Sequence, residues 1–301
     1  MRGTSGSDAT KPPSAPIVVG VDGSDSALAA VSWAAAECAR HHLALRLVHG
    51  FMLPMSGYSE MLITGTEARH AIEQQARGRL TEAAAAARAT APDVEISTEV
   101  LCCGAAGLLI EESKKARLVV VGSRGLGTVT GLLVGSTAVA LAAHGHSPVV
   151  VVRGTAVPGG PVVVGVDGSP TSEAALAFAF EAASVRGAVL IALMTSQDFT
   201  VDSAYNVSRI AIDWGQVEED ERRLLAQRLA GWQEKLPDIE VRRVVLRDRP
   251  ARVLMRYGAE AQLLVVGSHG HGGFAGMLIG STSQALVHHA PCPLAIVRTP
   301  K

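Results

Sequence analysis

The chain is poor in cysteine, and its cysteines are not spaced for metal or disulfide chemistry. The four of them, Cys38, Cys102, Cys103 and Cys292, form no C-x-x-C pair, the spacing typical of zinc and redox sites. Neighbouring residues of a strand point to opposite faces of a sheet, so Cys102 and Cys103 are not expected to join. The pattern predicts reduced, mostly buried thiols.

Excess charge of one sign and long unbroken apolar runs are also lacking. With 27 basic and 28 acidic residues, the chain offers no basic surface for a polyanion, and we expect no nucleic-acid partner. The most apolar long region, 132–152, is interrupted by glycines, histidines and a proline, which argues against a membrane span. Residues 1–15 lack the apolar core of a secretory signal and predict a disordered tail, so we expect a cytoplasmic protein.

What the sequence does contain is an internal repeat. Its 301 residues are 48% hydrophobic and 18% charged, enough for two globular domains. Three features recur 145 residues apart, namely GVDGS at Gly20 and Gly165, a glycine-rich segment at Gly122 and Gly267, and a proline before the last strand at Pro148 and Pro293. One shared register indicates a duplicated domain. We predict domains over 16–153 and 161–299, joined by a Gly/Pro-rich linker over 154–160.

Apolar runs and helical periodicity alternate strictly within each copy. In the first copy we expect strands at 17–22, 43–49, 94–101, 118–121 and 149–152, and helices at 26–41, 67–90, 105–115 and 136–143. In the second we expect strands at 162–167, 189–194, 240–246, 263–266 and 294–297, and helices at 172–186, 217–235, 251–258 and 281–289. The fold class is therefore α/β, with two tandem flavodoxin-like or Rossmann-like doubly wound domains. Each is a five-stranded parallel sheet with helices on both faces.

Two recurring features fall at carboxyl ends of strands, where such sheets bind ligands. One is the aspartate of GVDGS, Asp22 or Asp167. The other is a glycine-rich loop after the fourth strand, with the frame Gly, two residues, Gly, nine residues, Gly-Ser. Its members are Gly122, Gly125, Gly135 and Ser136 in one copy and Gly267, Gly270, Gly280 and Ser281 in the other. Glycines before a helix N-terminus let a phosphate approach the backbone N–H groups, so the loop predicts an anion cradle.

Two common phosphate-binding motifs are excluded. Neither glycine segment contains a lysine, which removes the G-x-x-x-x-G-K-[ST] loop of Walker-type ATPases. Neither follows the first strand, where the dinucleotide-binding G-x-G-x-x-G belongs.

The GVDGS turn, the glycine frame and the proline-led last strands (SPVVVVR and CPLAIVR) resemble the universal stress protein family in its tandem form. The segment GWQEKLPDIEVRRVVLRDRPAR, 231–252, is similar to the mycobacterial type. The resemblance implies one ATP site per domain, with or without magnesium. In the first domain it would comprise Gly20, Val21, Asp22, Gly50, Val121, Gly122, Gly125, Gly135, Ser136 and Thr137. In the second it would comprise Gly165, Val166, Asp167, Thr195, Val266, Gly267, Gly270, Gly280, Ser281 and Thr282.

The resemblance also assigns roles to these residues. It places Asp22 and Asp167 near adenine and ribose, and the glycine loop with Ser136 or Ser281 on the phosphates and ribose. Thr137 and Thr282 would extend the phosphate contacts. Gly50 and Thr195, expected just beyond the second strand, would touch adenine through main-chain groups. Because the last strands of the family pair across a two-fold axis, the two domains should form an intramolecular pseudo-dimer, and whole chains a homodimer.

Simpler interpretations stay open. Asp22 and Asp167 could only cap the next helix, and the glycines could only permit tight turns. A zinc site at His269, His271, His288, His289 and Cys292 is disfavoured because no ligand cluster recurs in the first copy. The sequence thus favours an ATP-binding, nucleotide-dependent sensor or regulator of the stress response or growth. The alternatives are a slow metal-dependent ATPase using Asp22 or Asp167, and a scaffold with vestigial nucleotide loops.

Overall fold

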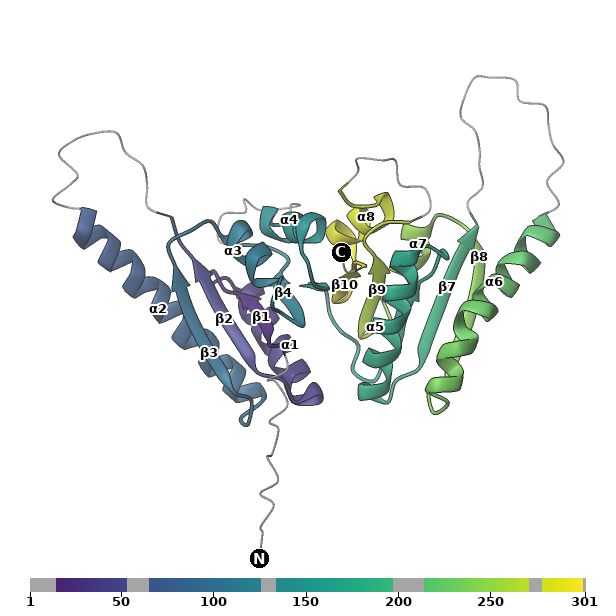
Figure 1. Ribbon diagram of the computed structural model, residues 1–301, viewed down its shortest axis with the longest axis horizontal. Helices are drawn as coiled ribbons and strands as arrows, with labels where there is room; N and C mark the ends of the chain where they lie inside the picture. Colours follow the sequence, from purple (N-terminus) through teal and green to yellow (C-terminus); the bar gives the residue numbers. More distant parts are fainter. Residues whose placement is uncertain (1–14, 53–64, 126–133, 197–213, 271–277, 300–301) are drawn as a thin grey trace, which may run out of the picture.

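Strands alternate with helices along the chain in two copies of one arrangement (Figure 1). The structure is a computed structural model that describes residues 15–52, 65–125, 134–196, 214–270 and 278–299. The first copy contains β1 (Ile17–Gly20), α1 (Asp25–His41), β2 (Leu45–Gly50), α2 (Gly65–Thr90), β3 (Ile96–Leu101), α3 (Ala105–Glu112), β4 (Leu118–Gly122), α4 (Ser136–His144) and β5 (Val149–Val152). The second contains β6 (Val162–Gly165), α5 (Pro170–Arg186), β7 (Leu190–Ser196), α6 (Trp214–Lys235), β8 (Val241–Arg247), α7 (Pro250–Gly258), β9 (Leu263–Gly267), α8 (Ser281–His289) and β10 (Leu294–Val297).

The strands form one sheet that runs through both copies in the order β3-β2-β1-β4-β5-β10-β9-β6-β7-β8. Within each half all neighbouring strands are parallel, which confirms the predicted α/β class. The halves join where β5 and β10 pair antiparallel, with Val150 opposite Ala295. This pairing confirms the expected pseudo-dimer within the chain and covers two apolar strands that would otherwise be sheet edges.

Helices cover both faces of the sheet, as the alternation of strand side chains requires. Val19 packs with α1 and α2 in a core that continues across both halves to α5 and α6. Its neighbour Val18 points the other way, into a core with α3 and α4. The equivalent core of the second half includes Leu254 of α7 and Leu286 of α8. The alanine-rich stripe of α1, including Ala34, is fully buried, so the helix lies close to the sheet.

Several predicted boundaries are corrected by the structure. The second strand begins at Leu45, not at 43, because α1 ends on His42 in the left-handed conformation (φ 54°) and the chain must first turn back. Gly50 is the last residue of β2, and Thr195 lies inside β7, because both strands pair along their full length with the edge strands β3 and β8. Neither residue therefore lies beyond its strand.

The expectation of mostly buried thiols holds for two cysteines and is wrong for a third. Cys38 and Cys292 are buried, and burial raises the pKa of each thiol to about 12. Cys102 is exposed, because β3 ends at Leu101 and the Cys102–Cys103 pair lies in the turn that follows. All four cysteines are free.

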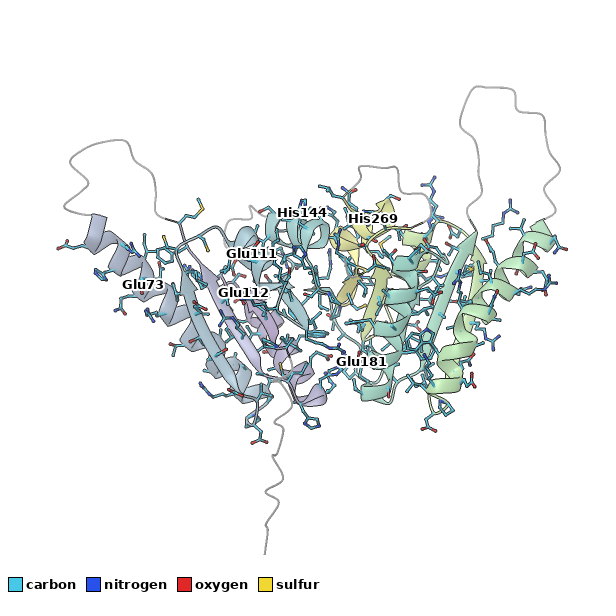
Figure 2. All side chains as sticks on the ribbon, viewed as in Figure 1. Glu73, Glu111, Glu112, His144, Glu181 and His269 are labelled. Atoms are coloured by element: carbon cyan, nitrogen blue, oxygen red, sulfur yellow. The ribbon has the colours of Figure 1, made fainter. Side chains whose placement is uncertain are left out.

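A cluster of charged side chains joins α1 to α5 across the two halves. Glu37 of α1 accepts a hydrogen bond from Arg186 of α5, and both side chains are almost fully buried, with 5% and 4% exposed. At the rim of the cluster Glu181 accepts from Arg117 at 2.6 Å, and Figure 2 shows Glu181 at the junction of the halves. The domains are thus fixed by polar contacts on one face of the sheet as well as by strand pairing.

No helix in the described part of the chain is both long enough and apolar enough to cross a bilayer.

Candidate functional site

The Asp-Gly-Ser turn and the glycine loop meet in both domains. A methyl group added to Gly125 would lie 2.7 Å from Asp22 Oδ2, and one added to Gly270 would collide with Asp167 Oδ2. The carboxylate thus lies directly against the loop, and only glycine leaves it room. The structure brings together the two features that the sequence placed at the ends of different strands.

The aspartates shape the turn and do not cap the helix. The Ser24 N–H donates to Asp22 Oδ1 at 2.9 Å, and the Ser169 N–H donates to Asp167 Oδ1 at 3.0 Å. The N-cap of α1 is Ser24, whose hydroxyl accepts from the Ala27 N–H, and the N-cap of α5 is Ser169. The capping interpretation of the aspartates is therefore wrong. In each copy one carboxylate oxygen holds the turn while the other faces the loop.

A hydroxyl that sequence reasoning missed clamps the glycine loop to the first helix of its domain. Ser26 Oγ donates to the Arg124 carbonyl, and Thr171 Oγ1 donates to the His269 carbonyl. A methyl group on Gly122 would lie 2.6 Å from Ser26, so the first glycine of the loop is required by this close approach. A hydroxyl at the same place in both repeats, 145 residues apart, was the signal that could have revealed the clamp.

The loop ends at a helix whose first N–H groups have no side-chain cap. The N-cap residues of α4 and α8 are Gly135 and Gly280, which carry no side chain, and Ser136 and Ser281 are the first helical residues. The Gly135 N–H donates to the Ser123 carbonyl at 3.0 Å, and the Gly280 N–H to the Ser268 carbonyl at 2.8 Å. These hydrogen bonds join the end of each loop to its beginning. The uncapped N–H groups carry the positive end of the helix dipole and suit an anion.

The remaining predicted residues lie on the strand ends that surround this cradle. Gly20 and Gly165 are the last residues of β1 and β6, and Val21 and Val166 directly follow them. Val121 and Val266 are the next-to-last residues of β4 and β9. Thr137 and Thr282 lie in the first turns of α4 and α8. Gly50 is required by packing, because a methyl group there would lie 2.8 Å from the Cys103 carbonyl oxygen.

His49 distinguishes the first site from the second. Its buried ring donates from Nδ1 to the Val21 carbonyl at 2.6 Å. Burial lowers the pKa of His49 below 6.5, and the nearby charge of Arg79 lowers it further, so the imidazole is neutral near pH 7. The equivalent residue in the second domain is Met194, which is buried as well.

The histidines of the second loop do not gather with other ligands in the described part of the chain. There, no three His, Cys, Asp or Glu side chains come together in a way that could hold a metal ion. His269 Nδ1 forms a hydrogen bond with Ser268 Oγ at 3.1 Å. Figure 2 shows His269 near the junction of the halves. His271 lies outside the described residues.

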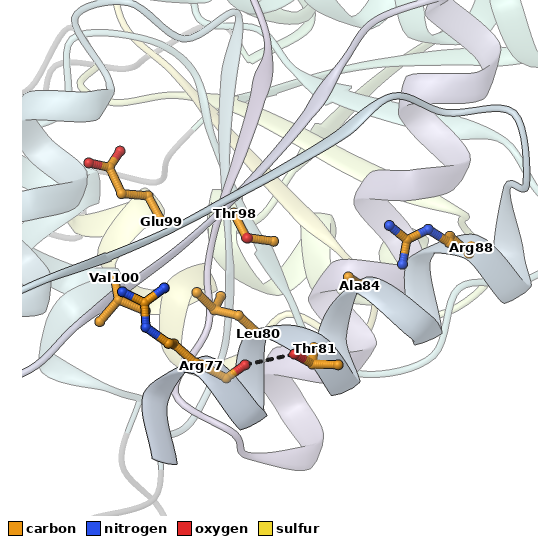
Figure 3. Close-up of a pocket in the computed structure, with 8 residues that line it drawn as sticks. All are labelled: Arg77, Leu80, Thr81, Ala84, Arg88, Thr98, Glu99 and Val100. Carbon is orange, nitrogen blue, oxygen red and sulfur yellow. Dashed lines mark hydrogen bonds between the residues drawn. The ribbon is translucent and has the colours of Figure 1, made fainter. Parts of the chain in front are cut away.

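A separate hollow of about 480 Å³ lies between α2 and the edge strand β3 (Figure 3). Its lining residues are Arg77, Leu80, Thr81, Ala84, Arg88, Thr98, Glu99 and Val100. None of them belongs to the Asp-Gly-Ser turn or to the glycine loop, so this hollow is distinct from the predicted site.

The fold and the repeated turn and loop define a class, that of tandem doubly wound α/β proteins with an aspartate turn against a glycine loop at the sheet's carboxyl edge. Comparison with known proteins narrows the class. Residues 14–153 and 160–298 each match the Universal stress protein family. A universal stress protein of Mycolicibacterium smegmatis is 41% identical over 293 residues, 94% of this chain and 96% of the relative. One from Mycobacterium tuberculosis is 38% identical over 309 residues, 95% of each chain.

A solved structure that covers nearly the whole chain agrees on the fold. The crystal structure of a universal stress protein from Archaeoglobus fulgidus superposes with a TM-score of 0.71 at 17% identity, covering 95% of this chain and 98% of the other. A universal stress protein crystallised in complex with cAMP matches 47% of this chain at 30% identity, with a TM-score of 0.34. The chain belongs to the universal stress protein family and contains two of its domains in tandem.

Proposed function

We propose that each domain binds one ATP. Nucleotide occupancy would make the protein a cytoplasmic sensor or regulator of the stress response or growth of the cell. The observation that carries this proposal is the contact between Asp22 and Gly125 beside the glycine-capped start of α4, with its counterpart in the second domain. An anion cradle beside a carboxylate can hold the phosphates of a nucleotide while the carboxylate accepts hydrogen bonds from its hydroxyl or amino groups.

The chemistry of these residues suits such a ligand. Glycines at positions 122 and 125 let the loop lie against Ser26 and Asp22, and the N-cap Gly135, which has no side chain, leaves the first N–H groups of α4 open to a phosphate. Ser136 and Thr137, at the first turn of α4, add hydroxyls beside those donors. Asp22 would lie near the adenosine part, and magnesium, where present, would be held mainly by the phosphates themselves.

A direct measurement tests this function. Protein purified without added nucleotide is denatured, and the released nucleotide is identified and counted by chromatography and mass spectrometry. Two ATP per chain support one site per domain. If neither the released fraction nor calorimetric titration of stripped protein shows an adenine nucleotide, the proposal is wrong.

The slow ATPase is a second candidate because the Asp22 carboxylate lies against the loop that would hold the phosphates. A carboxylate there could help position a divalent ion. ATP turnover that persists through purification and disappears in the Asp22→Ala, Asp167→Ala double variant would favour it over binding alone.

A further inference from the structure

An arginine from the long helix of each domain lies on the Asp-Gly-Ser turn. In the first domain, a methyl group added to Gly23 would lie 2.9 Å from Cδ and 3.0 Å from Nε of Arg79, on α2. In the second domain, Nη2 of Arg228, on α6, donates to the Gly168 carbonyl at 3.4 Å. Gly23 and Gly168 are equivalent residues of the repeat, with φ of 89° and 81°. Each candidate site therefore has an arginine side chain against the glycine that follows its aspartate.

The two arginines are not equivalent positions of the repeat. At the offset of 145 residues, Arg79 corresponds to Leu224, and Arg228 corresponds to Ala83. Arg79 and Ala83 are four residues apart, about one helical turn. The duplication thus supplied an arginine to the same location from two different turns. A packing contact inherited from one ancestral domain would occupy equivalent positions, so the recurring feature is the cation itself.

A cation at this location has a function if the ligand is a polyanion. The Asp22 and Asp167 carboxylates lie against the loops that would hold the phosphates, and like charges repel strongly in a partly buried site. A guanidinium on the same turn offsets that repulsion and presents several N–H donors to phosphate oxygens. Among the described residues, Arg228 Nε of the second domain is buried without a hydrogen-bond partner. This donor is thus left for a ligand, while Nη1 of the same guanidinium pairs with Glu173 Oε1.

The electrostatic setting of the two arginines differs. Arg228 Nη1 forms an ion pair with Glu173 at 3.2 Å. The residue equivalent to Glu173 in the first domain is Leu28, so Arg79 has no corresponding carboxylate. The first site therefore presents a stronger positive charge at its turn than the second.

We propose that Arg79 and Arg228 are nucleotide-binding residues that recognise the phosphates, and that the first-domain site selects more highly charged nucleotides because Glu173 partly neutralises Arg228. This inference rests on the proposed function of nucleotide binding. It goes beyond it by adding two residues and by making the paired sites unequal in charge selectivity.

The test is calorimetric titration of the stripped full chain with ATP, ADP and adenosine at two salt concentrations. Arg79→Gln should weaken ATP binding at one of the two sites roughly tenfold, as expected for loss of a charge-assisted hydrogen bond. Adenosine affinity should change less than about twofold, and the salt dependence at that site should become shallower. Arg79→Lys, which keeps the charge, should retain most of the ATP affinity.

Two further variants sharpen the result. Arg77→Gln is the matched control, because Arg77 lies on the same helix, pairs with Glu73 at 2.6 Å and faces the hollow beside β3 (Figure 3). It should leave ATP binding unchanged. Glu173→Leu copies Leu28 of the first domain, and by releasing Arg228 it should raise ATP affinity at the second site about threefold, a modest gain for a partly exposed ion pair.

The outcomes separate the two proposals. Equal losses of ATP and adenosine affinity in Arg79→Gln, or none, would show a packing role and overturn this inference while nucleotide binding stands. Wild-type protein that binds adenosine and ATP equally at both sites would also overturn it. A wild-type chain that binds no adenine nucleotide would instead refute the proposed function itself.

Discussion

Arg153 and Arg298 occupy equivalent positions, each directly after the last strand of its domain, and each donates into the other domain. Arg298 Nη1 donates to the carbonyls of Ala142 and Ala143 in α4, at 2.8 and 2.6 Å. Arg153 Nη1 donates to the Val287 carbonyl in α8. The acceptors are at the carboxyl ends of the helices that follow the glycine loops, where unpaired carbonyls carry the negative end of the helix dipole.

These crossed contacts should stabilise the docked domains. We expect Arg298→Ala to lower the free energy of unfolding by about 1–3 kcal/mol, because two carbonyls lose a charged donor in a half-buried setting. Urea denaturation followed by circular dichroism measures the change. Arg222→Ala is the control, since Arg222 forms an exposed pair with Glu218 on α6, a class worth less than about 1 kcal/mol. Equal effects of the two variants would contradict this role for Arg298.

The buried pair of Glu37 and Arg186 gives a second prediction about domain docking. Glu37→Leu leaves Arg186 buried without its carboxylate and should cost about 3–5 kcal/mol. Replacing both residues by leucine removes the unpaired charge, so the double variant should be more stable than Glu37→Leu alone. A double-mutant cycle in urea measures the coupling. Additive effects of the two single variants would show that the pair is not coupled.

The contact between Gly125 and Asp22 predicts the effect of one methyl group on binding. Gly125→Ala should lower ATP affinity at the first site about tenfold or more, because the new Cβ would lie 2.7 Å from Asp22 Oδ2 and force the turn and the loop apart. The comparison is Gly78→Ala in α2, where no atom lies within 4 Å of the added methyl group. That variant should raise stability by about 1 kcal/mol and leave ATP affinity unchanged. Unchanged ATP affinity in Gly125→Ala would refute the site geometry.

The hydroxyl clamp should matter more for binding than for folding. Ser26→Ala removes the hydroxyl that donates a hydrogen bond to the Arg124 carbonyl, and Thr171→Val removes the one that donates to the His269 carbonyl. We expect ATP affinity to fall several-fold at the affected site, because the loop loses part of its preorganisation. The melting temperature should change by only a few degrees, as for one hydrogen bond of about 1 kcal/mol. A large drop in melting temperature with unaltered affinity would assign the clamp to stability alone.

His49 predicts a specific pH dependence of stability. Its pKa is lowered from 6.5 in the folded protein, so the unfolded chain binds the proton more readily. The contribution of neutral His49 is complete above pH 6.5 and is lost as pH falls from there toward the lowered pKa, with a slope of at most about 1.4 kcal/mol per pH unit. His49→Met, which copies Met194, should flatten that decline. Urea unfolding at pH 7.5, 6.5 and 5.5 checks it, and identical slopes for both proteins would contradict it.

Local sequence determined the parts of the fold that depend on periodicity. Repeated apolar strands and alanine-rich helices gave the alternation, and the offset of 145 residues between GVDGS segments gave the duplication. The aspartate turn and the glycine frame were recognisable because their chemistry depends on backbone conformation, which Gly23 and Gly168 signal directly. Strand ends were harder to place, since Gly50 and Thr195 stay in their strands through pairing with distant residues of β3 and β8.

Tertiary structure alone decided which side chains meet. The crossed contacts of Arg153 and Arg298 and the clamp of Ser26 depend on approaches between residues about 100 or more positions apart, which no local pattern encodes. The same is true of Arg79 and Arg228, which reach equivalent turns from helix positions that the repeat does not relate. The sequence therefore determined the two glycine-loop frames, because glycine marks positions where the backbone conformation or a close approach excludes other residues. Only tertiary packing decided which charged side chains lie beside these loops, because the partner of a side chain depends on the whole fold.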